Sequence, residues 1–205
     1  MNRRLRLAVA QLYVVLDDAH THVLEAALRG GVDVVQLRDK EASDDDLVRA
    51  AEPFRRACDA YGALFVLNDR PDLVAACGAD GVHVGQSDAS VAKARALVGA
   101  ELLVGLSIET EAQLDAIAGA DYLGVGAVFA TPTKTESVAG GLELVRATAA
   151  RVTIPWFAIG GIELENVAEV VAAGAPGVAV VRAIRDADDP EAAARDLRAA
   201  FPSEE

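Results

Sequence analysis

Eight short apolar runs, each followed by a longer stretch with helical spacing, constrain the fold more than any other feature of this sequence. The apolar runs span residues 12–16, 32–37, 64–68, 81–84, 102–106, 122–128, 156–159 and 178–181. The helical stretches span about 20–29, 43–60, 71–76, 88–98, 110–118, 141–150, 164–173 and 189–200. Because the runs lack polar alternation, they indicate strands covered on both faces, as in a parallel sheet. The pattern predicts an α/β fold, a single-domain (β/α)8 TIM barrel.

An open, doubly wound parallel sheet is the alternative that this pattern leaves. The chain has 205 residues, 52% of them hydrophobic, which is enough for one core and lies at the short end for a barrel. No linker or low-complexity segment interrupts the alternation. We therefore expect one catalytic domain over residues 1–205, with a core at about 10–200 and a loose tail at 202–205.

Charge limits the classes of partner. The chain has 19 basic and 32 acidic residues, a formal net charge of −13. Nucleic acids and anionic membranes bind clustered positive charge, so we expect neither as a partner. The sequence contains no run of about 18 apolar residues, so we expect no membrane-spanning helix. The expected partners are small-molecule substrates, and the sequence leaves open whether the protein is a homo-oligomer.

The N-terminus and the cysteines favour a cytoplasmic protein. Arg3 and Arg4 precede an apolar run, but Gln11 interrupts it and no small-residue cleavage site follows, which disfavours export. Cys58 and Cys77 have neither metal-binding nor redox spacing. We therefore expect two free thiols in a reducing compartment.

Polar residues follow the strands at their carboxyl ends, where barrel enzymes place their chemistry. After the second strand, the period of two places Gln36, Arg38 and Lys40 on one face. An amide and two cations suit an anion with several oxygens, such as a diphosphate. The alternative is a solvated loop with an Arg–Asp pair.

Two aspartates follow the next two strands. Asp69 and Asp88 lie on neighbouring loops, and two carboxylates with phosphate oxygens are a typical Mg²⁺ environment. The alternatives are a turn before Pro71 for Asp69 and a helix N-cap for Asp88. We interpret His83, inside its strand, as a packed histidine and not as a metal ligand.

Ser107 ends the fifth strand and has no histidine or acidic residue within sequence reach. We therefore expect it to bond to a substrate heteroatom and not to act as a nucleophile. The sixth strand leads into the segment 131–134, Thr-Pro-Thr-Lys, whose hydroxyls and ammonium suit phosphate. A solvated loop lysine is the alternative for Lys134.

The last two strands end in Gly160-Gly161 and in Val181-Arg182. Loops after these strands commonly hold phosphate on backbone N–H groups in this fold, and glycine lets the backbone approach closely. A Gly-Gly pair also makes an ordinary strand–helix turn. What favours a phosphate site is the position of this pair after the seventh of the eight predicted strands.

Five motifs in this order resemble the thiamine-phosphate synthase family, over about residues 12–184. They are Gln36-Leu37-Arg38-Asp39-Lys40, Asn68-Asp69-Arg70, His83-Val84-Gly85-Gln86-Ser87-Asp88, Thr131-Pro132-Thr133-Lys134 and Ile159-Gly160-Gly161-Ile162. The resemblance implies a barrel that joins a hydroxymethylpyrimidine diphosphate to a thiazole phosphate or its carboxylated form. It implies thiamine phosphate and pyrophosphate as products and Mg²⁺ as cofactor.

The resemblance also implies roles for individual residues. It assigns Arg38, Lys40 and Lys134 to neutralising the departing pyrophosphate, and Asp69 and Asp88 to magnesium. The implied pyrimidine diphosphate contacts are Gln36, Leu37, Arg38, Asp39, Lys40, Asn68, Ser107 and Lys134. The implied thiazole phosphate contacts are Thr131, Pro132, Thr133, Gly161, Val181 and Arg182.

One position departs from the family, which usually has serine where this chain has Arg182. The arginine either clamps the thiazole phosphate or turns outward and leaves the backbone N–H groups to bind it. The implied chemistry is dissociative substitution by positioning and leaving-group stabilisation. It needs no covalent nucleophile, in agreement with the lack of a serine–histidine or cysteine–histidine arrangement in the sequence. The alternatives are a thiazole tautomerase on the same barrel and a non-catalytic thiamine-phosphate binder.

Overall fold

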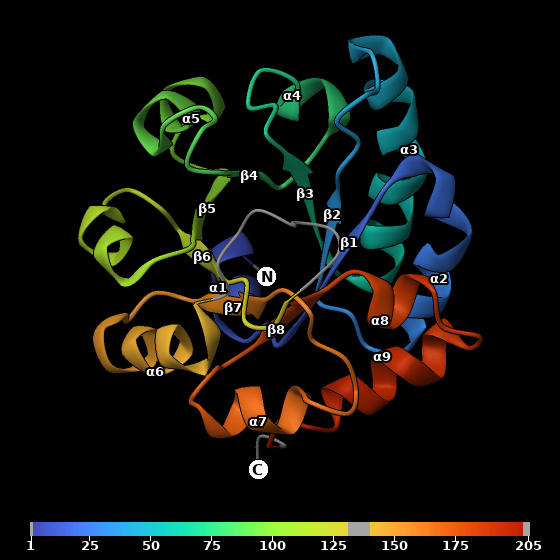
Figure 1. The fold of residues 1–205 in the computed structure, drawn as a ribbon. Coiled ribbons are helices and arrows are strands. Elements are labelled where there is room, and N and C mark those ends of the chain that lie inside the picture. The colour runs from blue at the N-terminus through green and yellow to red at the C-terminus, as the bar shows by residue number, and fades with distance from the viewer. Residues whose placement is uncertain (1, 131–139, 203–205) are drawn as a thin grey trace.

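The computed structural model describes residues 2–130 and 140–202 and shows a closed barrel of eight parallel strands (Figure 1). The strands pair in chain order, and β1 closes the ring by pairing with β8. Their bounds are β1 Leu12–Leu16, β2 Val34–Leu37, β3 Leu64–Asn68, β4 Gly81–Val84, β5 Leu103–Ile108, β6 Tyr122–Val125, β7 Trp156–Ile159 and β8 Val178–Val180. The barrel prediction is confirmed, and the open-sheet alternative is wrong.

Helices cover the outside of the barrel. Their bounds are α2 Thr21–Arg29, α3 Asp44–Tyr61, α4 Val74–Cys77, α5 Val91–Val98, α6 Gly141–Arg151, α7 Val167–Ala172, α8 Arg182–Arg185 and α9 Pro190–Arg198. The fifth predicted helix is a 3₁₀ helix, η2 Glu111–Ala116, and a second one, η1 Asp18–His20, precedes α2. None of the described helices combines the length and apolar character needed to cross a bilayer.

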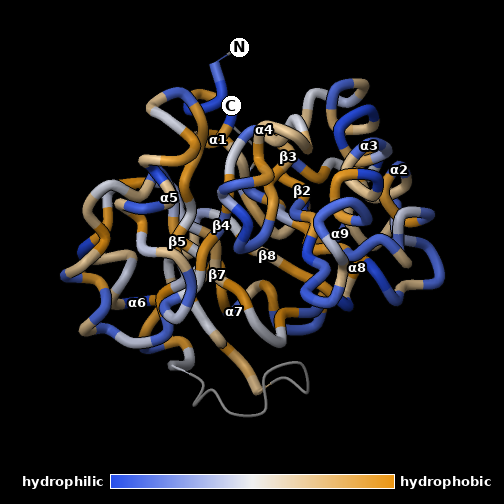
Figure 2. The backbone as a smooth tube through the Cα atoms, turned by 90° about the horizontal axis from the view of Figure 1, so that it is seen from above, coloured by the Kyte–Doolittle hydropathy of each residue, from blue (hydrophilic) through white to orange (hydrophobic). Residues whose placement is uncertain are grey.

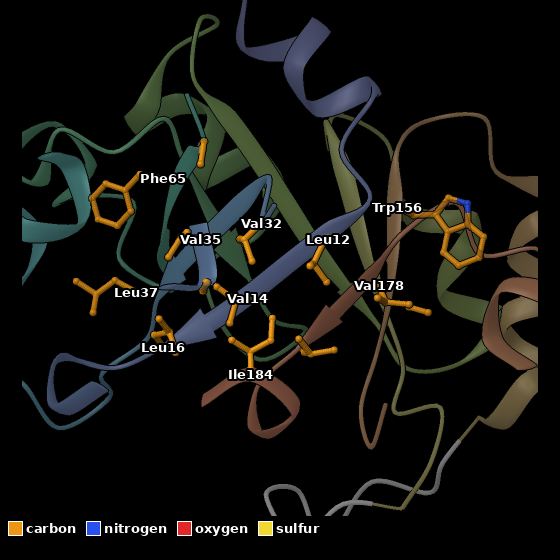
Figure 3. Packing of buried hydrophobic residues seen from close by; sticks show 14 of the residues in the cluster. Leu12, Val14, Leu16, Val32, Val35, Leu37, Phe65, Trp156, Val178 and Ile184 are labelled. Atoms are coloured by element: carbon orange, nitrogen blue, oxygen red, sulfur yellow. The ribbon is translucent and has the colours of Figure 1, made fainter. Parts of the chain in front are cut away.

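Strand residues alternate between two apolar layers, because successive side chains of a strand point to opposite faces. In β1, Leu12, Val14 and Leu16 point outward, and Figure 3 shows them with Ile184 of α8 in the layer between strands and helices. Tyr13 points into the barrel, where the buried interior residues form a separate cluster. Figure 2 shows the hydrophobic residues concentrated on the central strands, with hydrophilic residues on the peripheral segments.

The N-terminal helix α1, Arg3–Ala8, lies at the amino end of the barrel, close to its axis in Figure 1. Leu7 is buried in the interior cluster, while Arg3 and Arg4 pair with Asp80 and Asp121 at the amino ends of β4 and β6. The sequence did not predict this helix, because distant partners and not its own periodicity hold it in place.

An aspartate directly precedes each of β2, β4 and β6 and ties that strand to its predecessor. Asp33 accepts from the Leu12 N–H at 3.0 Å, and Asp80 accepts from Phe65 N–H at 2.9 Å. Asp121 repeats the contact on β5, with Val104 N–H at 2.8 Å. Arginines pair with all three carboxylates: Arg198 with Asp33, Arg3 and Arg55 with Asp80, and Arg4 and Arg95 with Asp121.

We expect Asp80→Asn to lower the free energy of unfolding by about 3 kcal/mol at neutral pH, because it leaves two arginines without their buried partner. The net pKa of Asp80 is lowered. Burial alone would raise it, but the hydrogen bond from the Phe65 N–H and the ion pair with Arg55 have the larger combined effect. Stability from a lowered carboxyl pKa is present above the unfolded value, about 3.9, and is lost as pH falls through the folded pKa.

The difference from wild type should therefore shrink below about pH 4, as urea denaturation at neutral and acid pH can measure. Asp196→Asn is the matched control, since Asp196 is exposed on α9. Equal unfolding free energies for Asp80→Asn and Asp196→Asn would contradict the structural role of Asp80.

Candidate active site

A cavity of about 260 Å³ opens at the carboxyl ends of the strands, where the sequence placed the chemistry. Every strand or the residues directly after it contribute to its wall. The predicted site residues that line it are Gln36, Arg38, Lys40, Asn68, Asp69, Asp88, Ser107, Gly161, Val181 and Arg182. The loops thus bring together residues that are up to 146 positions apart in the chain, from Gln36 to Arg182.

The end of β2 presents one amide and two cations to the cavity. Gln36, Arg38 and Lys40 all line it, as the period of two predicted. Leu37 and Asp39, to which the resemblance also assigned the pyrimidine diphosphate, are not among the residues that line the cavity. Leu37 is buried in the outer apolar layer, and Asp39 accepts from the backbone N–H groups of the following turn.

Asp69 and Asp88 face each other across neighbouring loops, as predicted. Burial raises the pKa of Asp69, and the Asp88 carboxylate raises it further, while Lys40 lowers it from 3.3 Å away. Asp69 has a left-handed backbone with φ of 57°, a region that aspartate tolerates better than most residues. Asn68 Nδ2 donates to Asp69 Oδ2 at 2.7 Å and thereby fixes the orientation of that carboxylate.

The second carboxylate is held by its own loop. Gly85 N–H donates to Asp88 Oδ2 at 3.0 Å, and a Cβ added at Gly85 would lie 2.6 Å from that oxygen. Only glycine therefore leaves room for the Asp88 carboxylate in this position.

Two adjacent carboxylates that repel each other fit a divalent cation. Mg²⁺ is usually bound by one or two carboxylates, with water and substrate phosphates completing its octahedron. Within the described parts of the chain no group of three or more His, Cys, Asp or Glu side chains could hold a metal. Asp69 and Asp88 therefore fit a metal bound together with a phosphorylated ligand, not a metal enclosed by protein ligands.

A hydrogen-bonded chain crosses the barrel interior below the charged rim. Gln36 Nε2 donates to Tyr13 Oη at 2.7 Å, and Tyr13 Oη lies 3.2 Å from Tyr122 Oη. His83 joins Tyr122 Oη to Ser107 Oγ through Nδ1 at 3.2 Å and Nε2 at 3.0 Å. Tyr13 and Tyr122 were not among the site residues predicted from the sequence. The available signal was a tyrosine at an inward position of an apolar strand, because a buried tyrosine hydroxyl usually finds a polar partner.

The contact between Ser107 and His83 corrects one sequence-based statement. The sequence shows no histidine near Ser107, but β4 and β5 are neighbours and His83 pairs in register with Gly105. This register places His83 beside Ser107, two residues further along β5. A serine–histidine arrangement is therefore present, and the second ring nitrogen faces the Tyr122 hydroxyl.

The ends of β7 and β8 form the opposite wall. Gly161 has φ of 67°, and an added Cβ would lie 2.8 Å from Phe129 Cβ, so a side chain is excluded there. Arg182 lines the cavity and pairs with Glu163, Nη2 to Oε1 at 3.4 Å. Of the two orientations left open by the sequence, the structure therefore shows the arginine directed toward the site. The predicted residues Thr131, Pro132, Thr133 and Lys134 lie outside the described residues.

A closed (β/α)8 barrel with a charged cavity at the carboxyl ends of its strands defines a protein of the barrel-enzyme class. The sequence profile of the family described as "Thiamine monophosphate synthase" matches residues 10–184. This protein belongs to that family.

Individual relatives agree with the family. The thiamine-phosphate synthase of Streptomyces avermitilis is 47% identical, with 94% of each chain covered. That of Thermosynechococcus vestitus is 46% identical over 96% of this chain, although the chain spans only 58% of that longer protein. The structure of thiamine phosphate pyrophosphorylase from Pyrococcus furiosus superposes with a TM-score of 0.87 at 34% identity, covering 96% of both chains. Orotidine 5′-phosphate decarboxylase from Pyrococcus horikoshii, at 15% identity and a TM-score of 0.68, shares the fold.

Proposed function

We propose that this protein joins 4-amino-2-methyl-5-(diphosphooxymethyl)pyrimidine to 4-methyl-5-(2-phosphoethyl)thiazole, or to its carboxylated form, and releases thiamine phosphate and pyrophosphate. The observation that carries the proposal is the rim where Arg38, Lys40, Asp69 and Asp88 line one cavity in a member of this family. In the reaction the C–O bond between the methylene carbon and the diphosphate breaks, and its electron pair leaves with the diphosphate. The thiazole nitrogen forms the new C–N bond to the same methylene carbon.

The chain supplies positioning and charge and no covalent intermediate. Arg38 and Lys40 are placed to bind the diphosphate oxygens and stabilise the negative charge that grows as the C–O bond breaks. Holding the thiazole nitrogen near the methylene carbon converts an encounter of two molecules into a step within one complex. By family resemblance, Lys134 adds a third cation.

Asp69 and Asp88 would hold Mg²⁺, which would supply positive charge to the diphosphate oxygens when bound. The support is the repulsion between these two carboxylates, which a divalent ion relieves. A cytoplasmic location is a further part of the proposal, and it rests on the two free cysteines, Cys58 and Cys77.

The direct test mixes the purified chain with both substrates and Mg²⁺ and follows thiamine phosphate by chromatography and pyrophosphate by a coupled assay. Formation of both products at equal rates supports the proposal. Isomerisation of the thiazole carboxylate without the pyrimidine substrate would indicate the tautomerase instead. Tight binding of thiamine phosphate with no turnover would indicate a binding protein.

We expect Arg182→Ala to raise the KM for the thiazole phosphate about 10- to 100-fold, because hydrogen bonds to charged groups contribute about 1.5–3 kcal/mol. The KM for the pyrimidine diphosphate should stay unchanged, since that substrate is assigned to the opposite wall. Arg146→Ala on α6 is the control, because Arg146 pairs with Glu143 away from the cavity. An unchanged thiazole KM would show that Arg182 does not bind this phosphate.

A further inference from the structure

The buried chain Gln36–Tyr13–Tyr122–His83–Ser107 contains two phenols whose protonation is fixed by their surroundings. Burial raises the pKa of Tyr13 far above that of an exposed phenol, and burial raises the pKa of Tyr122 well above it as well. Both hydroxyls therefore stay protonated at neutral pH. Each has one hydrogen to donate and oxygen lone pairs that can accept.

The glutamine end fixes the direction of the hydrogen bonds. An amide nitrogen can only donate, so the Tyr13 oxygen accepts from Gln36 Nε2. The Tyr13 hydrogen is then left for the Tyr122 oxygen, 3.2 Å away. Tyr122 in turn has its own hydrogen for His83 Nδ1, also at 3.2 Å.

The direction of donation continues from the histidine to the serine. A neutral imidazole has one donor and one acceptor nitrogen. If Nδ1 accepts from Tyr122, Nε2 carries the hydrogen and donates it to Ser107 Oγ at 3.0 Å. The Ser107 hydroxyl hydrogen then points away from His83, and Ser107 lines the cavity.

We propose that Tyr13, Tyr122 and His83 are positioning residues that fix Ser107 as a hydrogen-bond donor to the substrate. An unprotonated nitrogen of a heteroaromatic ring has the lone pair that accepts such a hydrogen. Resting on the proposed function, that atom belongs to the aminopyrimidine, whose diphosphate is assigned to the neighbouring rim residues.

The same direction distinguishes this site from a nucleophilic serine site. A nucleophilic serine donates its hydrogen to the histidine, and a carboxylate orients the second ring nitrogen. Here the histidine donates to the serine, and a protonated tyrosine occupies the place of the carboxylate. The serine–histidine contact therefore orients a substrate contact and does not activate an attacking group.

Nitrogen-15 NMR of the imidazole groups tests the direction without any assay of activity. The chain has three histidines, so the His83 signals are assigned by their loss in His83→Gln. We expect His83 in the Nε2–H form, with Nδ1 unprotonated and accepting a hydrogen bond. Tyr122→Phe should move the Nδ1 resonance toward that of a non-bonded nitrogen. An Nδ1–H form, a doubly protonated ring, or an unmoved resonance in Tyr122→Phe would overturn the proposal.

Kinetics tests the consequence for the substrate. Tyr122→Phe should raise the KM for the pyrimidine diphosphate about tenfold, the effect of one hydrogen bond, and leave the thiazole phosphate KM unchanged. Tyr61→Phe is the matched control, because Tyr61 is the one tyrosine of the sequence outside this chain of hydrogen bonds and is exposed at the end of α3.

The two kinds of measurement separate the proposals. A wild-type chain with the expected His83 tautomer but no thiamine phosphate synthesis would contradict the proposed function and leave the fixed direction standing. Active enzyme with equal pyrimidine KM values in wild type and Tyr122→Phe would contradict the positioning role.

Discussion

Asp88→Asn and Asp69→Asn should each lower the rate of magnesium-dependent pyrophosphate release at least about a thousandfold, which corresponds to about 4 kcal/mol of lost stabilisation. Each change removes one of the two carboxylates that face each other at the rim. A single remaining carboxylate would hold the proposed Mg²⁺ weakly, and the departing diphosphate would lose the positive charge that Mg²⁺ would supply. Steady-state rates over a wide range of Mg²⁺ concentrations measure the effect.

The fold should remain intact in both variants. Burial and the neighbouring Asp88 carboxylate raise the pKa of Asp69, so the folded state contains a repulsion between the two negative charges. An amide keeps an acceptor oxygen for the Gly85 or Asn68 donor while removing the repulsion. Thermal unfolding close to wild type therefore separates loss of metal from loss of structure.

Asp72→Asn is the matched control for this experiment. Asp72 follows the same strand as Asp69, but it pairs with Arg70 and does not line the cavity. Its replacement should leave turnover within about twofold of wild type, as for a surface ion pair. Normal turnover of Asp69→Asn or Asp88→Asn would rule out the metal assignment.

The strand pattern predicted the barrel well because apolar runs are local signals. β1, β3, β4 and β7 begin and end where the sequence places them. β6 is shorter than expected, and the residue after it, Gly126, lies so near β7 that an added Cβ would be 1.8 Å from the Ile159 carbonyl oxygen. The helix α8 was missed because only Val181 separates it from β8, so its four residues read as the end of that strand.

The site was predictable to the extent that it follows the ends of strands. That rule placed Arg38, Lys40, Asp69 and Asp88 at one rim, and the structure brings them there. The contact of Ser107 with His83 depends on the register of β4 and β5, which no local pattern encodes. Contacts across the barrel, such as Tyr13 with Tyr122, depend on closure of the whole ring.

Lys40→Ala and Lys134→Ala should each lower kcat at least about 100-fold, or about 3 kcal/mol, since a cation on the leaving group acts most strongly as its charge develops. Lys40 lines the cavity beside Asp69, whereas the assignment of Lys134 rests on the family motif. The chain has one further lysine, Lys93, which is exposed on α5, so Lys93→Ala is a matched control with normal turnover.

Whether each substitution changes kcat or KM shows at which stage of the reaction the lysine acts. A loss in kcat and in kcat/KM together means that the ammonium acts on the departing diphosphate, because the contact is made in the transition state. A raised KM with unchanged kcat would contradict that role and mark a contact made equally in the ground state. Because Lys40 also offsets the negative charge of Asp69 from 3.3 Å away, its removal should in addition lower the Mg²⁺ concentration that gives half of the maximal rate.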